Sequence, residues 1–254
     1  MFTIRDPFTT EIIRDYFAKK NKDDLFLSTY RHGKPVIKDL NTKAFWDLKL
    51  SNPTRHPDSM AKRRIQYVAN IINNRKGKFL NIGFGSLDLE KKLKHVLPNN
   101  IHGVDISKWA VDNATKNIKG TFLQASIQKL PFKNNFFNTV NASEVLEHLP
   151  ADKVLNALGE INRVTKINGF IIVSVPLNEG LEEMITNGLN PNGHMRAYTT
   201  PIILKEIEVS GFSIRSTKHL FAFNRHYFLK NILSQTICPK RWEPNNIIVV
   251  AQKK

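Results

Sequence analysis

Two acidic residues and two histidines stand at spacings that suit metal binding or proton transfer. Glu144, Glu147 and His148 fall at positions i, i+3 and i+4, which point to one side of a helix. His194 would join them from a later loop. Two carboxylates and two imidazoles suit Mg²⁺, Mn²⁺ or Zn²⁺ and leave open positions for substrate oxygens. A metal held there would lower the pKa of a hydroxyl group and fix its geometry.

The same residues also allow chemistry without a metal. His148 and His194 are both candidate catalytic residues, because a histidine pKa near neutrality suits a general base. His194 could instead bind a substrate. Glu147 could cap a helix or form an ion pair, and His148 could be a structural side chain beside a ligand. These alternatives stay open at the level of the sequence.

A second group of residues predicts a crevice for a ribose-bearing ligand. Residues 79–83 form a short apolar run that leads into a turn with Gly83 and Gly85, and residues 101–105 form a second run that ends in Asp105. Such glycines let the backbone approach a ligand closely, and the acid accepts hydrogen bonds from ribose hydroxyls. The third glycine of a dinucleotide fingerprint is absent. Because a pyrophosphate needs that glycine, the motif favours S-adenosylmethionine over nicotinamide or flavin cofactors.

Strands and helices must alternate to bring these residues together. From residue 79 the apolar patterns predict a doubly wound, Rossmann-like α/β sheet with right-handed crossovers and helices on both faces. The expected strands lie near residues 79–83, 101–105, 121–124, 136–142, 169–175, 212–220 and 245–251. The expected helices lie near residues 86–96, 107–118, 150–166 and 200–210.

The first 78 residues show helical patterns without repeated strands. One helix is expected after Thr9 or Thr10, through Phe17. A second is expected after the cap residue Asp58, with an apolar face of Ile65, Val68, Ile71 and Ile72. We therefore expect a basic, mainly helical N-terminal cap at residues 1–78, contributing to the substrate pocket, and a sheet domain at residues 79–254.

The amino-acid composition limits the cellular compartments in which this protein is expected. The chain has 254 residues, of which 41% are hydrophobic and 24% are charged, as in globular proteins. No apolar run of about eighteen residues is present, so no membrane-spanning helix is expected. The first residues lack an apolar signal-peptide segment, and Cys238 is the only cysteine. We therefore expect a cytoplasmic protein in a reducing compartment.

The net charge of +16 lies almost entirely in the two flanks. Residues 1–78 carry +9, residues 79–217 carry +1 and residues 218–254 carry +6. Basic flanks around a neutral centre indicate an anionic partner, such as RNA, a phosphorylated acceptor or an acidic membrane surface. A surface that only maintains solubility is the alternative explanation.

Six segments in order resemble the class I S-adenosylmethionine-dependent methyltransferases, over roughly residues 60–254. They are residues 80–85 (LNIGFG), 103–107 (GVDIS), 130–140 (LPFKNNFFNTV), 143–149 (SEVLEHL), 160–169 (EINRVTKING), and 193–199 (GHMRAYT) with the later Gly211-Phe212. The resemblance implies a seven-stranded mixed sheet whose last strand runs antiparallel. It also implies that S-adenosylmethionine binds at the carboxyl ends of the first strands.

The resemblance implies the cofactor contacts as well. Gly83 and Gly85 would pack against the methionine part and the adenosine, and Asp105 would take the ribose hydroxyls. Ser126 and Ile127 would lie beside the adenine, and the backbone of residues 141–143 would lie under the methionine part. The implied cofactor-binding residues are thus Asn81, Gly83, Gly85, Asp105, Ile106, Ser126, Ile127, Asn141 and Ser143.

The Glu-x-x-Glu-His spacing with a later histidine is similar to two metal-dependent branches of this family. They are the ubiquinone-biosynthesis O-methyltransferases and the small-RNA 3′-end 2′-O-methyltransferases, which both present vicinal hydroxyls to a metal. The similarity implies a divalent metal, Mg²⁺ or Mn²⁺, as a second cofactor held by Glu144, Glu147, His148 and His194.

Three positions depart from the family pattern. Asn81, Ser126 and Asn138 stand where acids are usual, so they supply no negative charge to a cationic cofactor. Three functions follow as alternatives. The chain transfers a methyl group to an oxygen or nitrogen atom of a small or medium acceptor, or it modifies or binds RNA through its basic flanks, or it is a non-catalytic partner subunit.

Overall fold

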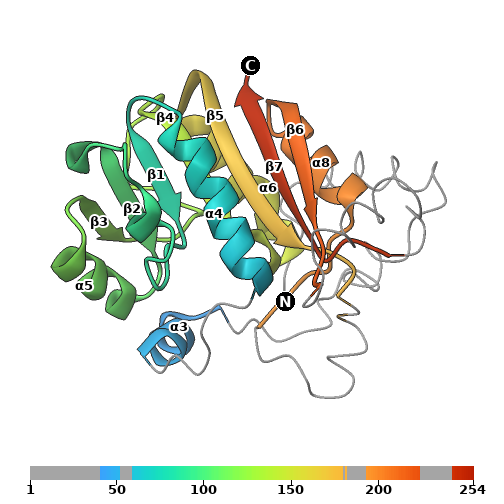
Figure 1. Cartoon of the computed structure of the whole chain (residues 1–254), viewed down its shortest axis with the longest axis horizontal. Helices are drawn as coiled ribbons and strands as arrows, with labels where there is room; N and C mark the ends of the chain where they lie inside the picture. The colour runs from blue at the N-terminus through green and yellow to red at the C-terminus, as the bar shows by residue number, and fades with distance from the viewer. Residues whose placement is uncertain (1–40, 52–58, 180, 182–192, 224–241) are drawn as a thin grey trace.

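The computed structural model describes residues 41–51, 59–179, 181, 193–223 and 242–254 (Figure 1). The helix expected before Phe17 and the cap residue Asp58 lie outside these residues. No helix among the described segments is long and apolar enough to cross a membrane.

A seven-stranded mixed sheet forms the centre of the described chain, in the order β3-β2-β1-β4-β5-β7-β6. The first five strands of this order are parallel, and β7 is antiparallel to both of its neighbours. The predicted fold, including its antiparallel last strand, is therefore confirmed. The strands are β1 (Phe79–Ile82), β2 (Ile101–Asp105), β3 (Thr121–Gln124), β4 (Phe137–Ser143), β5 (Thr165–Pro176), β6 (Phe212–Leu220) and β7 (Asn246–Lys253).

Helices cover both faces of the sheet (Figure 1). They are α4 (Ser59–Asn73), α5 (Lys108–Asn117), α6 (Ala151–Val164) and α8 (Thr200–Val209), whereas α3 (Lys43–Ser51) lies below the sheet in this view. Three short 3₁₀ helices lie between them: η2 (Glu90–Lys92), η3 (Pro98–Asn100) and η4 (Leu146–His148). Ser107 caps α5, because its hydroxyl oxygen accepts a hydrogen bond from the backbone amide of Ala110.

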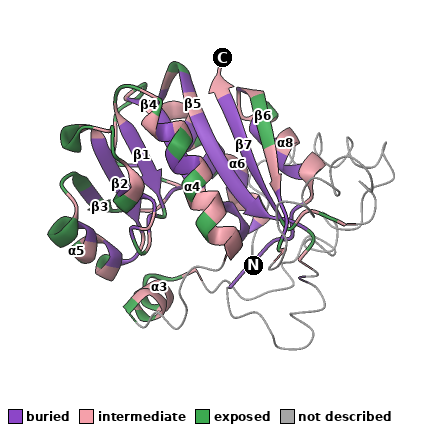
Figure 2. Ribbon diagram, in the orientation of Figure 1, coloured by how far each residue is buried: buried purple, intermediate pink, exposed green. Residues whose placement is uncertain are grey.

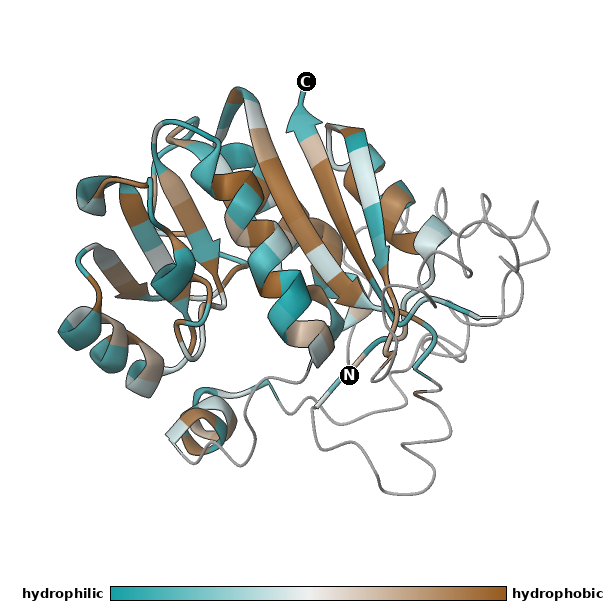
Figure 3. Cartoon of the chain, in the orientation of Figure 1, coloured by the Kyte–Doolittle hydropathy of each residue, from teal (hydrophilic) through white to brown (hydrophobic). Residues whose placement is uncertain are grey.

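The core has one apolar layer on each face of the sheet. On one face, α6 and α8 bury residues such as Leu158 and Ile203 against the central strands. On the other face, α4 buries Val68 and Ile72 against Ile172 of β5 and other strand residues. Figure 2 shows the central strands buried, and Figure 3 shows the hydrophobic stretches of β5 and β7 that form both layers. Helix α4 is therefore part of the sheet's core, and the domain boundary at residue 78 stays a prediction.

The helix expected at residues 86–96 is absent, and this prediction is wrong. Turns and the short helix η2 take its place. Leu87 adopts a left-handed backbone conformation with φ of +66°, although its side chain is completely buried. This conformation stops a helix where one would begin. The buried side chains of Leu87, Leu89 and Glu90 then follow the path of the turn rather than a helical period.

Candidate active site

The turn after β1 shows why glycines stand at positions 83 and 85. Gly83 has φ of +67°, and a Cβ there would lie 2.6 Å from the Cγ2 atom of Val145. Gly85 has φ of +52°, and a Cβ would meet nothing closer than a side-chain carbon of Leu50 at 3.7 Å. Both glycines are needed for a left-handed backbone, but only Gly83 is also confined by a neighbouring side chain.

Asp105 ends β2 and is fixed by backbone amides. Its Oδ2 atom accepts a hydrogen bond from the Gly85 amide at 3.0 Å, and its Oδ1 atom accepts one from the Ser107 amide at 2.9 Å. Burial raises the pKa of the Asp105 carboxyl, although these amide hydrogen bonds oppose the rise. Two carboxylate oxygens held rigidly at the end of a strand can accept hydrogen bonds from two neighbouring hydroxyls.

An open cavity of about 180 Å³ lies above this turn. Six of the predicted cofactor residues line it: Gly83, Gly85, Asp105, Ile106, Ser126 and Ile127. The crevice is therefore not filled by side chains, and Asp105 faces it. Three other predicted residues, Asn81, Asn141 and Ser143, do not line the cavity and form a buried polar chain instead.

That polar chain ends at an acid which sequence reasoning missed. Asn81 donates a hydrogen bond from Nδ2 to Oε1 of Glu90 at 2.6 Å, and its own Oδ1 accepts one from Asn141 Nδ2 at 2.7 Å. The Ser143 hydroxyl donates to Asn141 Oδ1 at 2.9 Å. Burial raises the pKa of Glu90 to about 7. Glu90 was missed because it falls within the wrongly predicted helix.

Helix α3 covers one side of the cavity. Asn41, Trp46 and Leu50 line the cavity from this segment. Asp47 holds α3 against the start of α5, since its Oδ1 atom accepts hydrogen bonds from the Ser107 hydroxyl at 2.6 Å and from the backbone amide of residue 109 at 3.0 Å. On the other side, the Asn41 side chain donates a hydrogen bond to the backbone oxygen of His148.

A second cavity, of about 600 Å³, adjoins the first. Trp46, Glu144 and His148 line both cavities. Charged side chains are prominent in the second cavity's wall: Lys49, Arg64, Glu144, Glu147 and Glu179. His194 also lines it. The two cavities thus meet at a shared wall that contains an imidazole.

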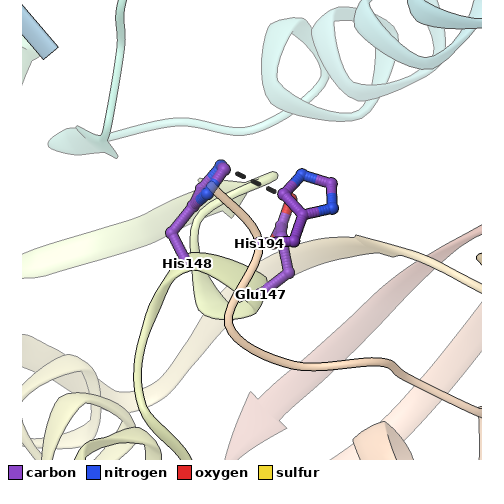
Figure 4. Close-up of side chains that lie close together, drawn as sticks. All are labelled: Glu147, His148 and His194. Atoms are coloured by element: carbon purple, nitrogen blue, oxygen red, sulfur yellow. Dashed lines mark ion pairs between the residues drawn. The ribbon is translucent and has the colours of Figure 1, made fainter. Parts of the chain in front are cut away.

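Glu147, His148 and His194 gather beside this wall (Figure 4). One ligand atom from each residue lies within 4.8 Å of the others. Glu147 is completely buried, and neither of its carboxylate oxygens has a hydrogen-bond partner among the described residues. Burial raises the pKa of Glu147 well above its usual range, with Glu144 and Glu179 adding to the rise. Burial, together with His194, lowers the pKa of His148 to about 3.

Glu144 does not join this cluster, so the prediction that Glu144, Glu147 and His148 share one helical face is wrong. Glu144 lies before η4, with φ of +56°, which turns its side chain away from the path of a helix. Its Oε2 atom pairs with Nη1 of Arg64 at 3.0 Å, and its Oε1 atom accepts a hydrogen bond from the Ser174 hydroxyl at 2.9 Å. Asn246 donates a further hydrogen bond to Oε1 at 3.0 Å.

Comparison with known proteins agrees with this geometry. Residues 80–173 match a family model described as a methyltransferase domain. Residues 80–173 are therefore a class I S-adenosylmethionine-dependent methyltransferase domain. The matched residues include the glycine turn, Asp105 and η4, which are the elements that build the first cavity and its shared wall.

The chain has partial relatives among curated proteins. It is 32% identical over 116 residues to the ribosomal protein L11 methyltransferase of Dictyoglomus turgidum, in an alignment covering 45% of this chain and 37% of that protein. It is 30% identical over 130 residues to an uncharacterised methyltransferase of Schizosaccharomyces pombe, covering 46% and 44%. The chain thus spans less than half the length of these two relatives.

Solved structures share the fold. The N-methyltransferase NodS of Bradyrhizobium japonicum, solved in complex with S-adenosyl-L-homocysteine, superposes on this chain with a TM-score of 0.61. The two are 12% identical, and the match covers 84% of this chain and 98% of that one.

Two more contributors to the site had no signal in the sequence. Trp46 lies far before the sheet and belongs to no motif, although it lines both cavities. Glu179 accepts a hydrogen bond from the Nδ1 atom of His194, with the two atoms 2.8 Å apart. Only the fold brings these residues to the shared wall.

Proposed function

We propose that this chain transfers the methyl group of S-adenosylmethionine to an oxygen or nitrogen atom of an acceptor bound in the second cavity. The observation that supports this most is the wall shared by the two cavities, because methyl transfer requires the acceptor atom to approach the sulfonium methyl in line. A cofactor in the first cavity and an acceptor in the second would meet beside His148.

The first cavity suits the cofactor's adenosine. Asp105 offers two oriented oxygens for the ribose hydroxyls, and Ser126 and Ile127 line the part of the wall where the adenine would lie. Trp46 and the rest of α3 cover the ligand from one side. NodS, a protein of the same fold, was solved with S-adenosyl-L-homocysteine, which is what S-adenosylmethionine becomes when it gives up its methyl group.

His194 is the candidate general base. Its Nδ1 atom lies 2.8 Å from Glu179 Oε2, and a proton on Nδ1 would put the basic lone pair of the imidazole on Nε2, the nitrogen that would take a proton from the acceptor. Glu179 would orient the imidazole, as a positioning residue. His148 is buried and neutral, so it suits contact with the acceptor or a metal better than proton removal.

A divalent metal is the alternative use of this cluster, in which His194 would be a ligand instead of a base, and it fits through three ligands rather than four. Glu147 is a buried carboxyl with no hydrogen-bond partner among the described residues, and its Oε1 atom lies 4.0 Å from Nε2 of His148, one of the two imidazoles that face it. Glu144 is occupied by Arg64, Ser174 and Asn246. One carboxylate with two imidazoles favours Mn²⁺ or Zn²⁺ over Mg²⁺, which prefers oxygen ligands. A bound metal would lower the pKa of an acceptor hydroxyl.

Calorimetry and methyl transfer test this function together. Wild-type chain should bind S-adenosylmethionine, and Asp105→Ala should abolish that binding because the ribose contacts are lost. His194→Ala should keep cofactor affinity but lower turnover at least about 100-fold. His95→Ala, at an exposed histidine far from both cavities, is the matched control and should change neither. A wild-type chain that binds no cofactor would contradict the proposal.

The RNA-directed function stays a prediction. Of the +15 that the two flanks carry, residues 1–40 hold +2 and residues 224–241 hold +4, and both segments lie outside the described part of the chain. Affinity for RNA that falls steeply with salt would support it, since phosphate contacts release counterions. The non-catalytic alternative is excluded by turnover with any acceptor.

A further inference from the structure

We propose that Glu90 acts through Asn81, Asn141 and Ser143 as a buried negative pole that positions the ammonium group of the bound cofactor's methionine part. Glu90 would be a positioning residue that replaces a charge which Asn81 cannot carry. This inference rests on the proposed function, because it needs the cofactor to bind in the first cavity.

The hydrogen bonds of the polar chain that links Ser143 to Glu90 all run in one direction. An ionised carboxylate only accepts hydrogen bonds, so Glu90 Oε1 requires the amide nitrogen of Asn81 to face it. The Asn81 oxygen then faces Asn141 Nδ2, and the Asn141 oxygen faces the Ser143 hydroxyl. Each donor thus points toward Glu90. The hydroxyl oxygen of Ser143, which donates its only proton inward, is left as an acceptor at the far end.

That far end lies next to the cofactor cavity. Ser143 is the last residue of β4, and the two residues after it, Glu144 and Val145, line the cavity. Parallel pairing of β1 with β4 places Asn81 opposite Asn141, which sets the two amides side by side at the carboxyl ends of these strands. The chain therefore connects the buried acid to the edge of the sheet where the methionine part would lie.

Within the described part of the chain, Glu90 forms no ion pair with a cationic side chain. It is 3% exposed, and its Oε2 atom has no hydrogen-bond partner among the described residues. The charged groups near it, Asp88 and Asp105, are both acidic and oppose its ionisation. Burying such a group without a cationic partner is unfavourable. A positively charged ligand at the end of the polar chain would supply the missing partner.

A structural role is the alternative explanation, in which Glu90 only holds η2 against β1. Binding of two ligands distinguishes the positioning role of Glu90 from the structural role. S-adenosyl-L-homocysteine carries the amino-acid part with its ammonium group, whereas 5′-methylthioadenosine has the same adenosine and a thioether without the amino acid. A positioning role affects only the first ligand, and a structural role affects both.

The experiment is calorimetry of both ligands on the wild-type chain and on four variants. Glu90→Gln should lower the affinity for S-adenosyl-L-homocysteine by about tenfold, the size expected for a lost charge-assisted interaction. The same variant should bind 5′-methylthioadenosine within about twofold of wild type. The double variant Asn81→Asp with Glu90→Gln should restore binding of the first ligand, because it moves the charge one step along the same chain. Asp112→Asn, which removes an exposed charge on α5, should change neither ligand.

Ser143→Ala keeps the test decisive if Glu90→Gln does not fold. It removes the terminal hydroxyl of the polar chain and should lower the affinity for S-adenosyl-L-homocysteine but not the affinity for 5′-methylthioadenosine. Equal losses for both ligands, or an unchanged affinity for S-adenosyl-L-homocysteine in Glu90→Gln, would overturn the inference. Absence of binding to the wild-type chain would instead overturn the proposed function.

Discussion

Trp46 and His148 meet edge to face at the wall between the two cavities, with their ring centroids 4.7 Å apart. The indole nitrogen of Trp46 also donates a hydrogen bond to Asn41 Oδ1 at 3.1 Å, and Asn41 in turn donates to the backbone of His148. A residue from the segment before the sheet thus fixes an imidazole that follows β4. The N-terminal region contributes to the proposed acceptor site through this contact.

Replacing Trp46 should therefore affect both ligands of the proposed reaction. Trp46→Ala removes a ring contact worth about 1 kcal/mol and opens the wall. We expect cofactor affinity to fall about fivefold and turnover to fall further. Trp46→Phe keeps an edge-to-face ring and should retain most activity, even though it loses the hydrogen bond to Asn41. Equal activity in Trp46→Ala and wild type, measured by methyl transfer, would show that the wall does not need this ring.

The two glycines of the turn should respond differently to alanine. Gly83→Ala places a Cβ at 2.6 Å from Val145 in a left-handed backbone, so it should lower the free energy of unfolding by several kcal/mol. Gly85→Ala meets only the left-handed cost of roughly 1 kcal/mol, because its nearest neighbour would lie at 3.7 Å.

Urea unfolding measures both variants of this pair. Val145→Ala should recover part of the loss in Gly83→Ala, since it removes the atom that clashes. The same substitution should not help Gly85→Ala. If the two glycine variants were equally stable, contact with Val145 would not be the reason for glycine at position 83.

The sequence predicted the sheet well because its signals are local. Short apolar runs such as residues 247–250, a capping serine at the start of α5 and a glycine turn followed by an acid each report on neighbouring residues. The order of the strands and the place of Asp105 follow from them.

The contacts around Glu144 and Glu90 could not be read in this way. Spacing alone placed Glu144 on a helix with Glu147, but its left-handed backbone and its pair with Arg64 on α4 depend on residues far away in the sequence. Glu90 entered the site because Leu87 breaks the expected helix. A leucine in a left-handed conformation gives no sequence signal, since its side chain alone favours a helix.

The buried carboxyl of Glu90 should make the stability of the ligand-free chain fall with rising pH. Its pKa is about 7 in the folded chain, against about 4.3 for an unfolded glutamate. The folded state therefore holds the proton more tightly. The stabilisation is complete below the unfolded pKa and is lost as the pH rises through 7. The loss between pH 4 and pH 8 should be about 3 kcal/mol.

Comparison with Glu90→Gln isolates this effect from those of other buried acids. The difference in unfolding free energy between wild type and variant, measured in urea at several pH values, should change by that amount across the window. A difference that is independent of pH would mean that Glu90 titrates normally. Bound S-adenosyl-L-homocysteine should reduce the difference, because its ammonium group favours the ionised carboxyl.

Divalent metal should stabilise the chain through Glu147, His148 and His194. A ligand at about 100 times its dissociation constant stabilises a fold by about 2.7 kcal/mol, which corresponds to roughly 5 °C or more in melting temperature for a chain of this size. We expect Mn²⁺ or Zn²⁺ to give such a shift and Mg²⁺ to give less, because two of the three ligands are imidazoles. His95→Ala should show the same shift as wild type.

Two substitutions decide which carboxylates hold the metal. Glu147→Gln should remove the shift while leaving the metal-free melting temperature unchanged or higher, because the buried carboxyl already lacks a hydrogen bond from the described residues. Glu144→Gln should keep the shift but lower the metal-free melting temperature, since it breaks the pair with Arg64. Loss of the melting-temperature shift in Glu144→Gln would instead support the four-ligand site that the spacing predicted. A shift that survives Glu147→Gln would place the metal elsewhere on the chain.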